Sequence, residues 1–97
     1  MHQLPFDAQM TDKLFRLVQH ESSRPEVKGC LPSLAWSPGK GWLLAWIPRR
    51  DTAPARLFGV GGLSFYVSAQ VEPFLYDRVF DWDDSTGVVS HAAELNH

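Results

Sequence analysis

Residues 30–48, CLPSLAWSPGKGWLLAWIP, limit the possible fold more than any other part of the chain. Pro38–Gly39 predicts a turn, because proline presets one central dihedral of a turn and glycine tolerates a positive one. β-Favouring residues flank this turn on both sides, which predicts a hairpin with strands near 31–36 and 42–47. We therefore expect a fold organised around at least one antiparallel strand pair.

The second strand of this hairpin is apolar on both faces. Trp42 and Trp46 alternate onto one face, and the residues between and after them, also apolar, fall on the other. This pattern indicates either a strand covered on both sides or one whose outer face meets a partner. Because Trp is enriched at protein interfaces, we expect a partner-binding surface at Trp42 and Trp46, with Lys40 and Arg49 at the hairpin ends. The alternative is that the tryptophans build the core of a small domain.

A helix is predicted before the hairpin. Asp7 is the expected N-cap, since its carboxylate can accept hydrogen bonds from amides of the first turn. The apolar residues that follow at helical spacing are Met10, Leu14, Leu17 and Val18. Pro25 is expected to end the helix, because it disfavours helical dihedrals in the residue before it.

The second half of the chain alternates strands and turns. We expect one or two glycine-broken strands in residues 56–67 and strands in 78–84 and 88–91. A short helix from Ser68 to Tyr76 is expected between them, with Pro73 placed to shorten or distort it. The acidic run from Asp81 to Asp84 is expected to form a turn in which Asp side chains bond the backbone. Residues 91–97 are expected to form a loose C-terminal tail.

Composition sets outer limits. A chain of 97 residues with 44% hydrophobic and 21% charged residues predicts a single globular domain over 1–97. The net charge of −2 gives no reason to expect nucleic acid, and no apolar run is long enough to predict a membrane span. One cysteine, Cys30, and no recognisable secretion signal predict a cytoplasmic protein, of bacterial type.

The strand–helix–strand order of residues 62–82 resembles the HesB-like fold of A-type iron–sulfur carriers. The residues that carry this resemblance are Gly62, Leu63, Phe65 and Val67, then Phe74–Leu75, and then Phe80–Asp81–Trp82. The N-terminal helix and glycine-containing hairpin fit the same order. The resemblance implies an α+β fold: a small mixed β-sheet or β-sandwich with an N-terminal helix and a short second helix.

The chain departs from that family at the ligand positions. The family carries cysteines in a glycine-rich turn after its first strand and near its C-terminus, but Pro38–Gly41 and residues 91–97 contain none. Cys30 precedes the first predicted strand and matches neither position. Because an iron–sulfur cluster usually takes four thiolates, the resemblance implies the shape without the cluster chemistry. We expect no cofactor.

No catalytic or metal-binding constellation is recognisable in the sequence, so we predict no enzyme activity. Cys30 and His91 are the best of a weak set of metal ligands. The leading hypothesis is a cytoplasmic HesB-like accessory module that binds a protein partner and could form a homodimer. The alternative is an iron–sulfur or metal carrier that uses Cys30 and histidines across a dimer.

Overall fold

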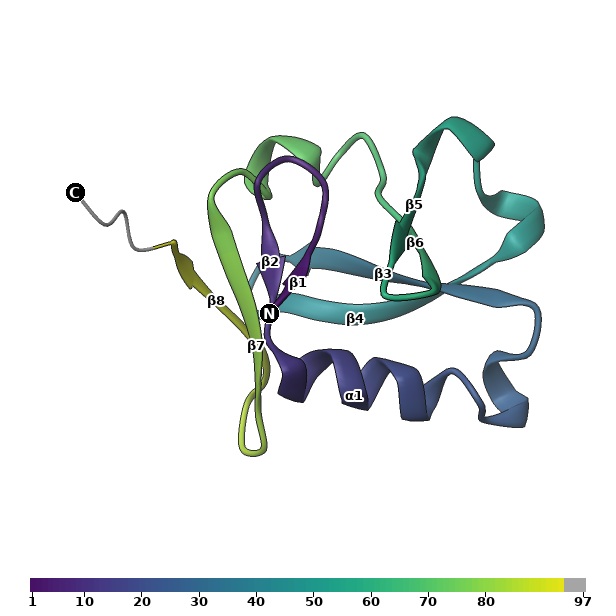
Figure 1. The fold of residues 1–97 in the computed structure, drawn as a ribbon, viewed down its shortest axis with the longest axis horizontal. Helices are drawn as coiled ribbons and strands as arrows, with labels where there is room; N and C mark the ends of the chain where they lie inside the picture. The colour runs from purple at the N-terminus through teal and green to yellow at the C-terminus, as the bar shows by residue number, and fades with distance from the viewer. Residues whose placement is uncertain (94–97) are drawn as a thin grey trace.

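The computed structural model describes residues 1–93 and arranges them as two four-stranded sheets and one α-helix (Figure 1). The regular elements are β1 (His2–Gln3), β2 (Gln9–Met10), α1 (Asp12–Glu21), β3 (Cys30–Ser37), β4 (Gly41–Pro48), β5 (Leu57–Val60), β6 (Leu63–Tyr66), β7 (Arg78–Asp83) and β8 (Gly87–Ala92). Short 3-10 turns lie between them: η1 (Pro25–Val27), η2 (Arg49–Asp51), η3 (Pro54–Arg56) and η4 (Glu72–Phe74).

Both sheets are mixed. The first has the strand order β1-β2-β7-β8, with β2 parallel to β7, and the second has the order β4-β3-β6-β5, with β3 parallel to β6. The remaining neighbours are antiparallel. In Figure 1, strands β7 and β8 run across β3 and β4, and α1 lies beneath β4. The predicted α+β class with mixed sheets is confirmed.

The predicted hairpin is confirmed as β3–β4, one residue longer at each strand end. Its register places Trp36 opposite Trp42 and Leu34 opposite Leu44. The turn closes with a hydrogen bond of 3.1 Å from the Lys40 amide to the Ser37 carbonyl, and Gly39 has a φ of 81°. A type II turn requires a positive φ at its third residue and often has proline at its second, and Gly39 and Pro38 fill these two positions.

The N-terminal helix is present, but its predicted start was wrong. Asp7 lies in the turn between β1 and β2 with a φ of 59°, and the N-cap is Thr11, whose hydroxyl accepts a hydrogen bond from the Leu14 amide. Met10 therefore belongs to β2 rather than to the helix, although its side chain is fully buried. Two residues are too few for a strand to show any sequence period, which is why β2 was missed.

The predicted short helix from Ser68 to Tyr76 is reduced to a single 3-10 turn, so its predicted length was wrong. The segment contains turns and the 3-10 element η4, in which Pro73 occupies the first turn. Proline has no amide hydrogen, so it cannot continue a helix begun before it. The segment still covers the core, because Val71 and Leu75 are buried.

The last strand extends further than predicted. His91 and Ala92 are the end of β8, so the expected loose tail does not begin at residue 91. Residues 94–97 of that predicted tail lie outside the described residues.

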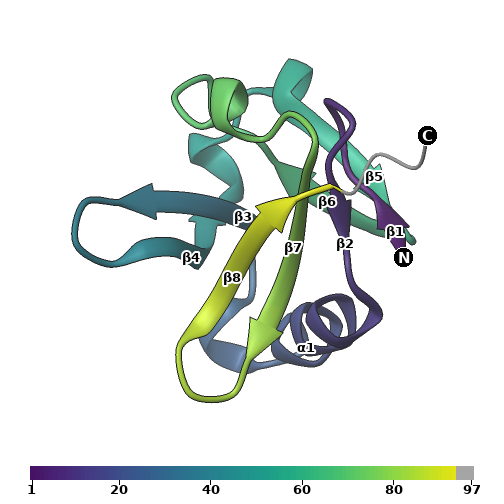
Figure 2. The same cartoon turned by 90° about the vertical axis from the view of Figure 1, so that its left-hand side faces the viewer.

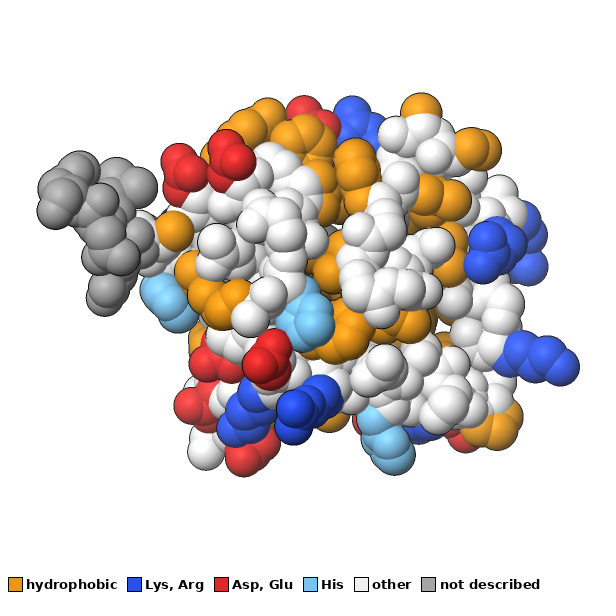
Figure 3. All heavy atoms as spheres, in the orientation of Figure 1, with side chains coloured by type: hydrophobic (Ala, Val, Ile, Leu, Met, Phe, Trp, Pro, Cys, Tyr) orange, Lys and Arg blue, Asp and Glu red, His pale blue; other side chains and the backbone are white. Residues whose placement is uncertain are grey.

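One hydrophobic cluster joins α1 to both sheets. Its fully buried members include Leu14 and Val18 from α1, Phe80 from β7 and Phe65 from β6. Burying side chains of this size stabilises a fold by about 1.5–3 kcal/mol each. Hydrophobic side chains nevertheless remain visible over much of the face drawn in Figure 3, so the core does not use all of the apolar surface.

Candidate functional site

The inner face of the β3–β4 hairpin carries three of the four tryptophans. Directly paired residues point their side chains to the same side of a sheet, so Trp36, Trp42 and Trp46 share the face of the buried Leu34. Figure 2 shows the hairpin projecting past β7 and β8. Because Trp36 lies near the projecting end, its side chain extends beyond the core and is 52% exposed.

Trp42 is anchored to the core while remaining part of the surface. Its ring meets the ring of the fully buried Phe80 edge to face, with centroids 4.8 Å apart and planes at 81°. This arrangement is favourable for two aromatic quadrupoles. Trp42, Trp46 and Trp82 are all half-buried and pack against the core cluster. The tryptophans therefore serve the core and the surface at once, and neither sequence interpretation alone describes them.

A groove of about 310 Å³ lies between the edges of the two sheets. We call it the β4–β8 groove. Its lining side chains are Leu17 and Glu21 of α1, Trp42, Leu43, Leu44 and Trp46 of β4, and Trp82, Thr86, Gly87 and Val88 of β7, β8 and their connecting turn. The lining is mostly apolar, and the one charged residue that the described part of the chain contributes to it, Glu21, is paired with Arg24.

The strands beside this groove are both sheet edges. β4 ends one sheet and β8 ends the other, so within residues 1–93 one side of each backbone has no strand partner in its sheet. β4 carries no charged residue. Proteins usually protect an edge strand with charge, a bulge or a covering segment, so an uncharged eight-residue edge is suited to contact with another chain.

A second groove, of about 390 Å³, lies on the other side of Trp42. We call it the aromatic groove. It is lined by Trp36, Trp42, Pro73, Phe74, Tyr76 and Arg78. Trp36, Phe74 and Tyr76 are each at least half exposed. Figure 2 shows the turn that contains η4 on the same side as the projecting hairpin, which brings these distant segments together.

The predicted surface residues are only partly brought together. Trp42 and Trp46 line the β4–β8 groove, as neighbours on one strand face. Lys40 lies in the hairpin turn and Arg49 in η2, so they stand at opposite ends of β4, and neither lines a groove. Both are exposed and remain candidates for the rim of a larger interface.

The predicted metal ligands are separated. Cys30 begins β3 and is half-buried, whereas His91 lies near the end of β8 and is exposed. The start of β3 and the end of β8 lie at opposite ends of the molecule in Figure 1. Within residues 1–93, no group of three or more His, Cys, Asp or Glu side chains is placed to hold a metal ion.

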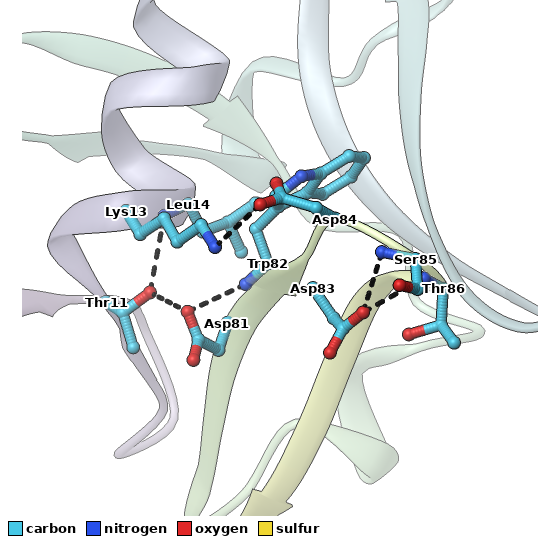
Figure 4. Close-up of polar contacts among 9 residues, drawn as sticks. All are labelled: Thr11, Lys13, Leu14, Asp81, Trp82, Asp83, Asp84, Ser85 and Thr86. Atoms are coloured by element: carbon cyan, nitrogen blue, oxygen red, sulfur yellow. Dashed lines mark hydrogen bonds and ion pairs between the residues drawn. The ribbon is translucent and has the colours of Figure 1, made fainter.

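The acidic run is used for structure (Figure 4). The Thr11 hydroxyl donates a hydrogen bond of 2.6 Å to Asp81 Oδ1, which also accepts one of 2.7 Å from the Trp82 amide. These two bonds lower the pKa of Asp81, because they stabilise the ionised carboxylate. Lys13 adds an exposed ion pair of 3.4 Å with Asp84.

Asp83 forms the expected turn between β7 and β8. Its Oδ1 accepts hydrogen bonds from the amides of Ser85 and Thr86, at 2.8 and 3.1 Å, and these bonds lower its pKa. The sequence interpretation of this run as an Asp-bonded turn is confirmed for Asp83. The contact between Asp81 and Thr11 could not be predicted locally, since the two residues lie far apart in the sequence.

The order of the elements and the two mixed sheets form the HesB-like fold that the sequence resemblance predicted. The same fold is found in the crystal structure of SufA from Escherichia coli, a protein involved in the biosynthesis of iron–sulfur clusters. The two chains superpose with a TM-score of 0.60 at 20% identity, over 88% of this chain and 84% of SufA. IscA, solved with a 2Fe–2S cluster, gives a TM-score of 0.56 at 12% identity over the same shares.

The similarity to these two structures shows the fold of this protein alone. No protein-family model matches the sequence, and no curated protein matches it. Among residues 1–93, no helix is both long and apolar enough to cross a membrane.

Proposed function

We propose that this protein acts by binding another protein, as a HesB-like accessory module without cluster-ligating cysteines. The observation that supports this proposal most strongly is the β4–β8 groove. Trp42, Trp46 and Trp82 are half-buried there beside an uncharged edge strand, and aromatic anchors next to an edge without charged residues suit protein contacts. Leu43, 39% exposed, lies on the same strand and extends the apolar surface.

The groove suits binding better than catalysis or metal ligation. Among the residues that the structure describes, its lining contains one carboxylate, already paired, and no histidine or cysteine. General acid–base and nucleophilic catalysis depend on groups of these kinds placed within hydrogen-bonding reach of the reacting atoms. Apolar surface of this kind stabilises a complex mainly because water is excluded when it packs against a complementary partner.

The test compares two variants with the same added charge. Leu43→Arg places a cation at the groove, whereas Ala55→Arg places one on the exposed 3-10 turn η3, which lines neither groove. We expect a partner captured by the immobilised wild-type protein to be retained by Ala55→Arg and depleted about tenfold or more by Leu43→Arg. Calorimetry with the purified partner would then measure the affinity. Equal retention by both variants, or no protein retained by the wild type, would contradict the proposal.

A homodimer is one form that such an interface could take. An isologous contact places the same patch on both subunits, so edge strand β4 could pair with its own copy. Sedimentation of the wild type and Leu43→Arg would show whether self-association uses this surface.

The cluster-carrying alternative has less support. IscA was solved with a 2Fe–2S cluster, but this chain has one cysteine in its whole length. A dimer would supply two thiolates, half of what a cluster usually takes. Anaerobic reconstitution with iron and sulfide tests this alternative.

A further inference from the structure

We propose that the aromatic groove is a binding site for an extended, proline-rich peptide segment that carries a carboxylate. This deepens the proposed function, on which it rests, by naming the chemistry of one ligand. The groove is separate from the β4–β8 groove except for Trp42, which forms a wall of both.

The polar groups of the lining are almost all hydrogen-bond donors. Among the lining side chains, Trp36 and Trp42 each carry an indole N–H, Arg78 carries a guanidinium, and Tyr76 carries a phenol that can also accept. Pro73 and Phe74 bring no polar side-chain atom. None of the four polar side chains takes part in the side-chain hydrogen bonds or ion pairs formed within residues 1–93. The groove therefore fits a ligand rich in acceptors and poor in donors.

A proline-rich segment has this composition. Proline lacks an amide hydrogen, and the polyproline II conformation makes no internal hydrogen bonds, so its carbonyl groups face outward as acceptors. Its rings pack on aromatic faces, and such segments are bound by aromatic-lined grooves in several unrelated domains. Because the segment is already extended when free, little conformational entropy is lost on binding.

The positive charge of Arg78 favours a proline-rich peptide that carries an acidic residue. Arg78 is the only charged residue of the lining, and it is exposed and unpaired among the described residues. A carboxylate next to the proline run would form a bidentate pair with its guanidinium. A lysine at the same place would be repelled.

The aromatic walls are held in position before any ligand arrives. Tyr76 packs against Phe6 with ring centroids 5.3 Å apart, and Phe6 also meets Phe58 at 5.7 Å. Phe6 has a φ of 62°, a left-handed conformation that is unfavourable for a bulky residue and therefore needs support from its surroundings. The opposite wall, Trp42, rests on Phe80.

The η4 side is fixed by an ion pair. Arg56 Nη1 lies 2.5 Å from Glu72 Oε1, and both side chains are about two-thirds buried. Because Glu72 begins η4, this pair holds the turn that presents Pro73 and Phe74. Because the side chains of a preformed site are already ordered, ligand binding costs less conformational entropy than at a site that the ligand must order.

The experiment uses the full chain and three synthetic peptides of equal length. The first is acetylated hexaproline ending in glutamate, the second replaces the glutamate by lysine, and the third keeps the glutamate after a glycine–serine sequence. Nitrogen-15 NMR follows the indole N–H signals of the four tryptophans, assigned with single Trp→Phe variants. We expect the proline–glutamate peptide to shift the Trp36 and Trp42 signals saturably, with smaller effects at Trp46 and Trp82.

The variants locate the site. Trp36→Ala and Tyr76→Ala are expected to weaken binding about tenfold, since both side chains are exposed walls whose removal leaves the core intact. Arg78→Gln is expected to weaken the glutamate peptide to the level of the lysine peptide. Ala55→Arg, which lines neither groove, is expected to leave peptide binding unchanged. Thermal unfolding of each variant checks that it is folded.

Three outcomes would overturn the inference: no saturable shift up to about 1 mM peptide, equal binding of the glycine–serine peptide, or full affinity in both Trp36→Ala and Tyr76→Ala. If peptides fail while Leu43→Arg still loses a captured partner, the inference fails and the proposed function stands. If the peptides fail and Leu43→Arg also captures the same proteins as the wild type in equal amounts, the inference and the proposed function both fail.

Discussion

The hydroxyl of Thr11 and the carboxylate of Asp81 join the start of α1 to the middle of β7 through a hydrogen bond of 2.6 Å. Thr11 also caps the helix by accepting a bond from the Leu14 amide at 3.3 Å. One side chain thus sets where the helix begins and how it is attached to the sheet, and this attachment places Leu17 at the β4–β8 groove.

Removal of the Thr11 hydroxyl should destabilise the fold, although the substitution is small. We expect Thr11→Val to lower the free energy of unfolding by about 1–2 kcal/mol, because the helix cap and a charge-assisted bond are both lost. Chemical denaturation measures the change. A double-mutant cycle with Asp81→Asn should show coupling of about 0.5 kcal/mol or more. Additive single effects would mean that the bond contributes nothing in solution.

Stability should depend on pH through Asp81. Its pKa is lowered by the hydrogen bond from Thr11 and then by that from the Trp82 amide. A carboxyl whose pKa is lower in the folded state than its unfolded value of about 3.9 binds fewer protons when folded, so stability rises with pH in that window. The contribution is complete above the unfolded pKa and is lost as the pH falls through the folded pKa.

The measurement compares urea midpoints of the wild type and Asp81→Asn from neutral pH down to acid. At low pH the free energy of unfolding of Asp81→Asn should fall less than that of the wild type. The part of the fall that remains should include the contribution of Asp83, whose pKa is also lowered. Parallel curves for the two proteins would contradict the assignment to Asp81.

Gly61 is the glycine for which replacement should cost most. It has a φ of 55°, and a Cβ there would lie 2.6 Å from Phe15 Cζ, in the core. We expect Gly61→Ala to lower the free energy of unfolding by about 2–4 kcal/mol, from left-handed strain and from displacement of the Phe15 ring.

Two neighbouring glycines separate these causes. Gly62 has a φ of 86° but open space around its Cβ position, so Gly62→Ala should show the strain alone, about 1–2 kcal/mol. Gly59 has neither feature, and Gly59→Ala should change stability little. Equal losses at Gly61 and Gly62 would mean that Phe15 moves aside without cost.

Tryptophan fluorescence should report the two surfaces differently. Trp36 is the most exposed of the four tryptophans, whereas Trp82 is half-buried between the core and the β4–β8 groove. Trp36→Phe should therefore remove more of the iodide-quenchable emission than Trp82→Phe does. A larger loss in Trp82→Phe would place the hairpin end against other parts of the chain in solution.

The sequence predicted the elements whose signals are local. Pro38–Gly39 and its flanking residues located β3 and β4 almost to the residue, because a turn and two alternating strands are encoded next to one another. Helix α1 was found, but Asp7 and Thr11 are both good N-caps, and only packing against β7 selects Thr11. Pro73 is the local signal that shortens the second helix to the 3-10 element η4.

The grooves could not be predicted in the same way. The sequence identified Trp42 and Trp46, but the β4–β8 groove also needs Leu17 and Val88, which only the crossing of the two sheets brings near. The aromatic groove joins the hairpin end to Tyr76 and Arg78, more than thirty residues later in the chain. Such sites depend on topology, and the family resemblance supplied the fold rather than the side-chain contacts.

Anaerobic reconstitution with iron and sulfide tests most directly the claim that this fold works without a cluster. The wild type and Cys30→Ser should both stay colourless between roughly 300 and 600 nm and hold far less than stoichiometric iron, because one thiolate per chain cannot supply the usual four. Stoichiometric iron and sulfide in the wild type, with visible absorption that Cys30→Ser loses, would contradict the account and identify the protein as a cluster carrier.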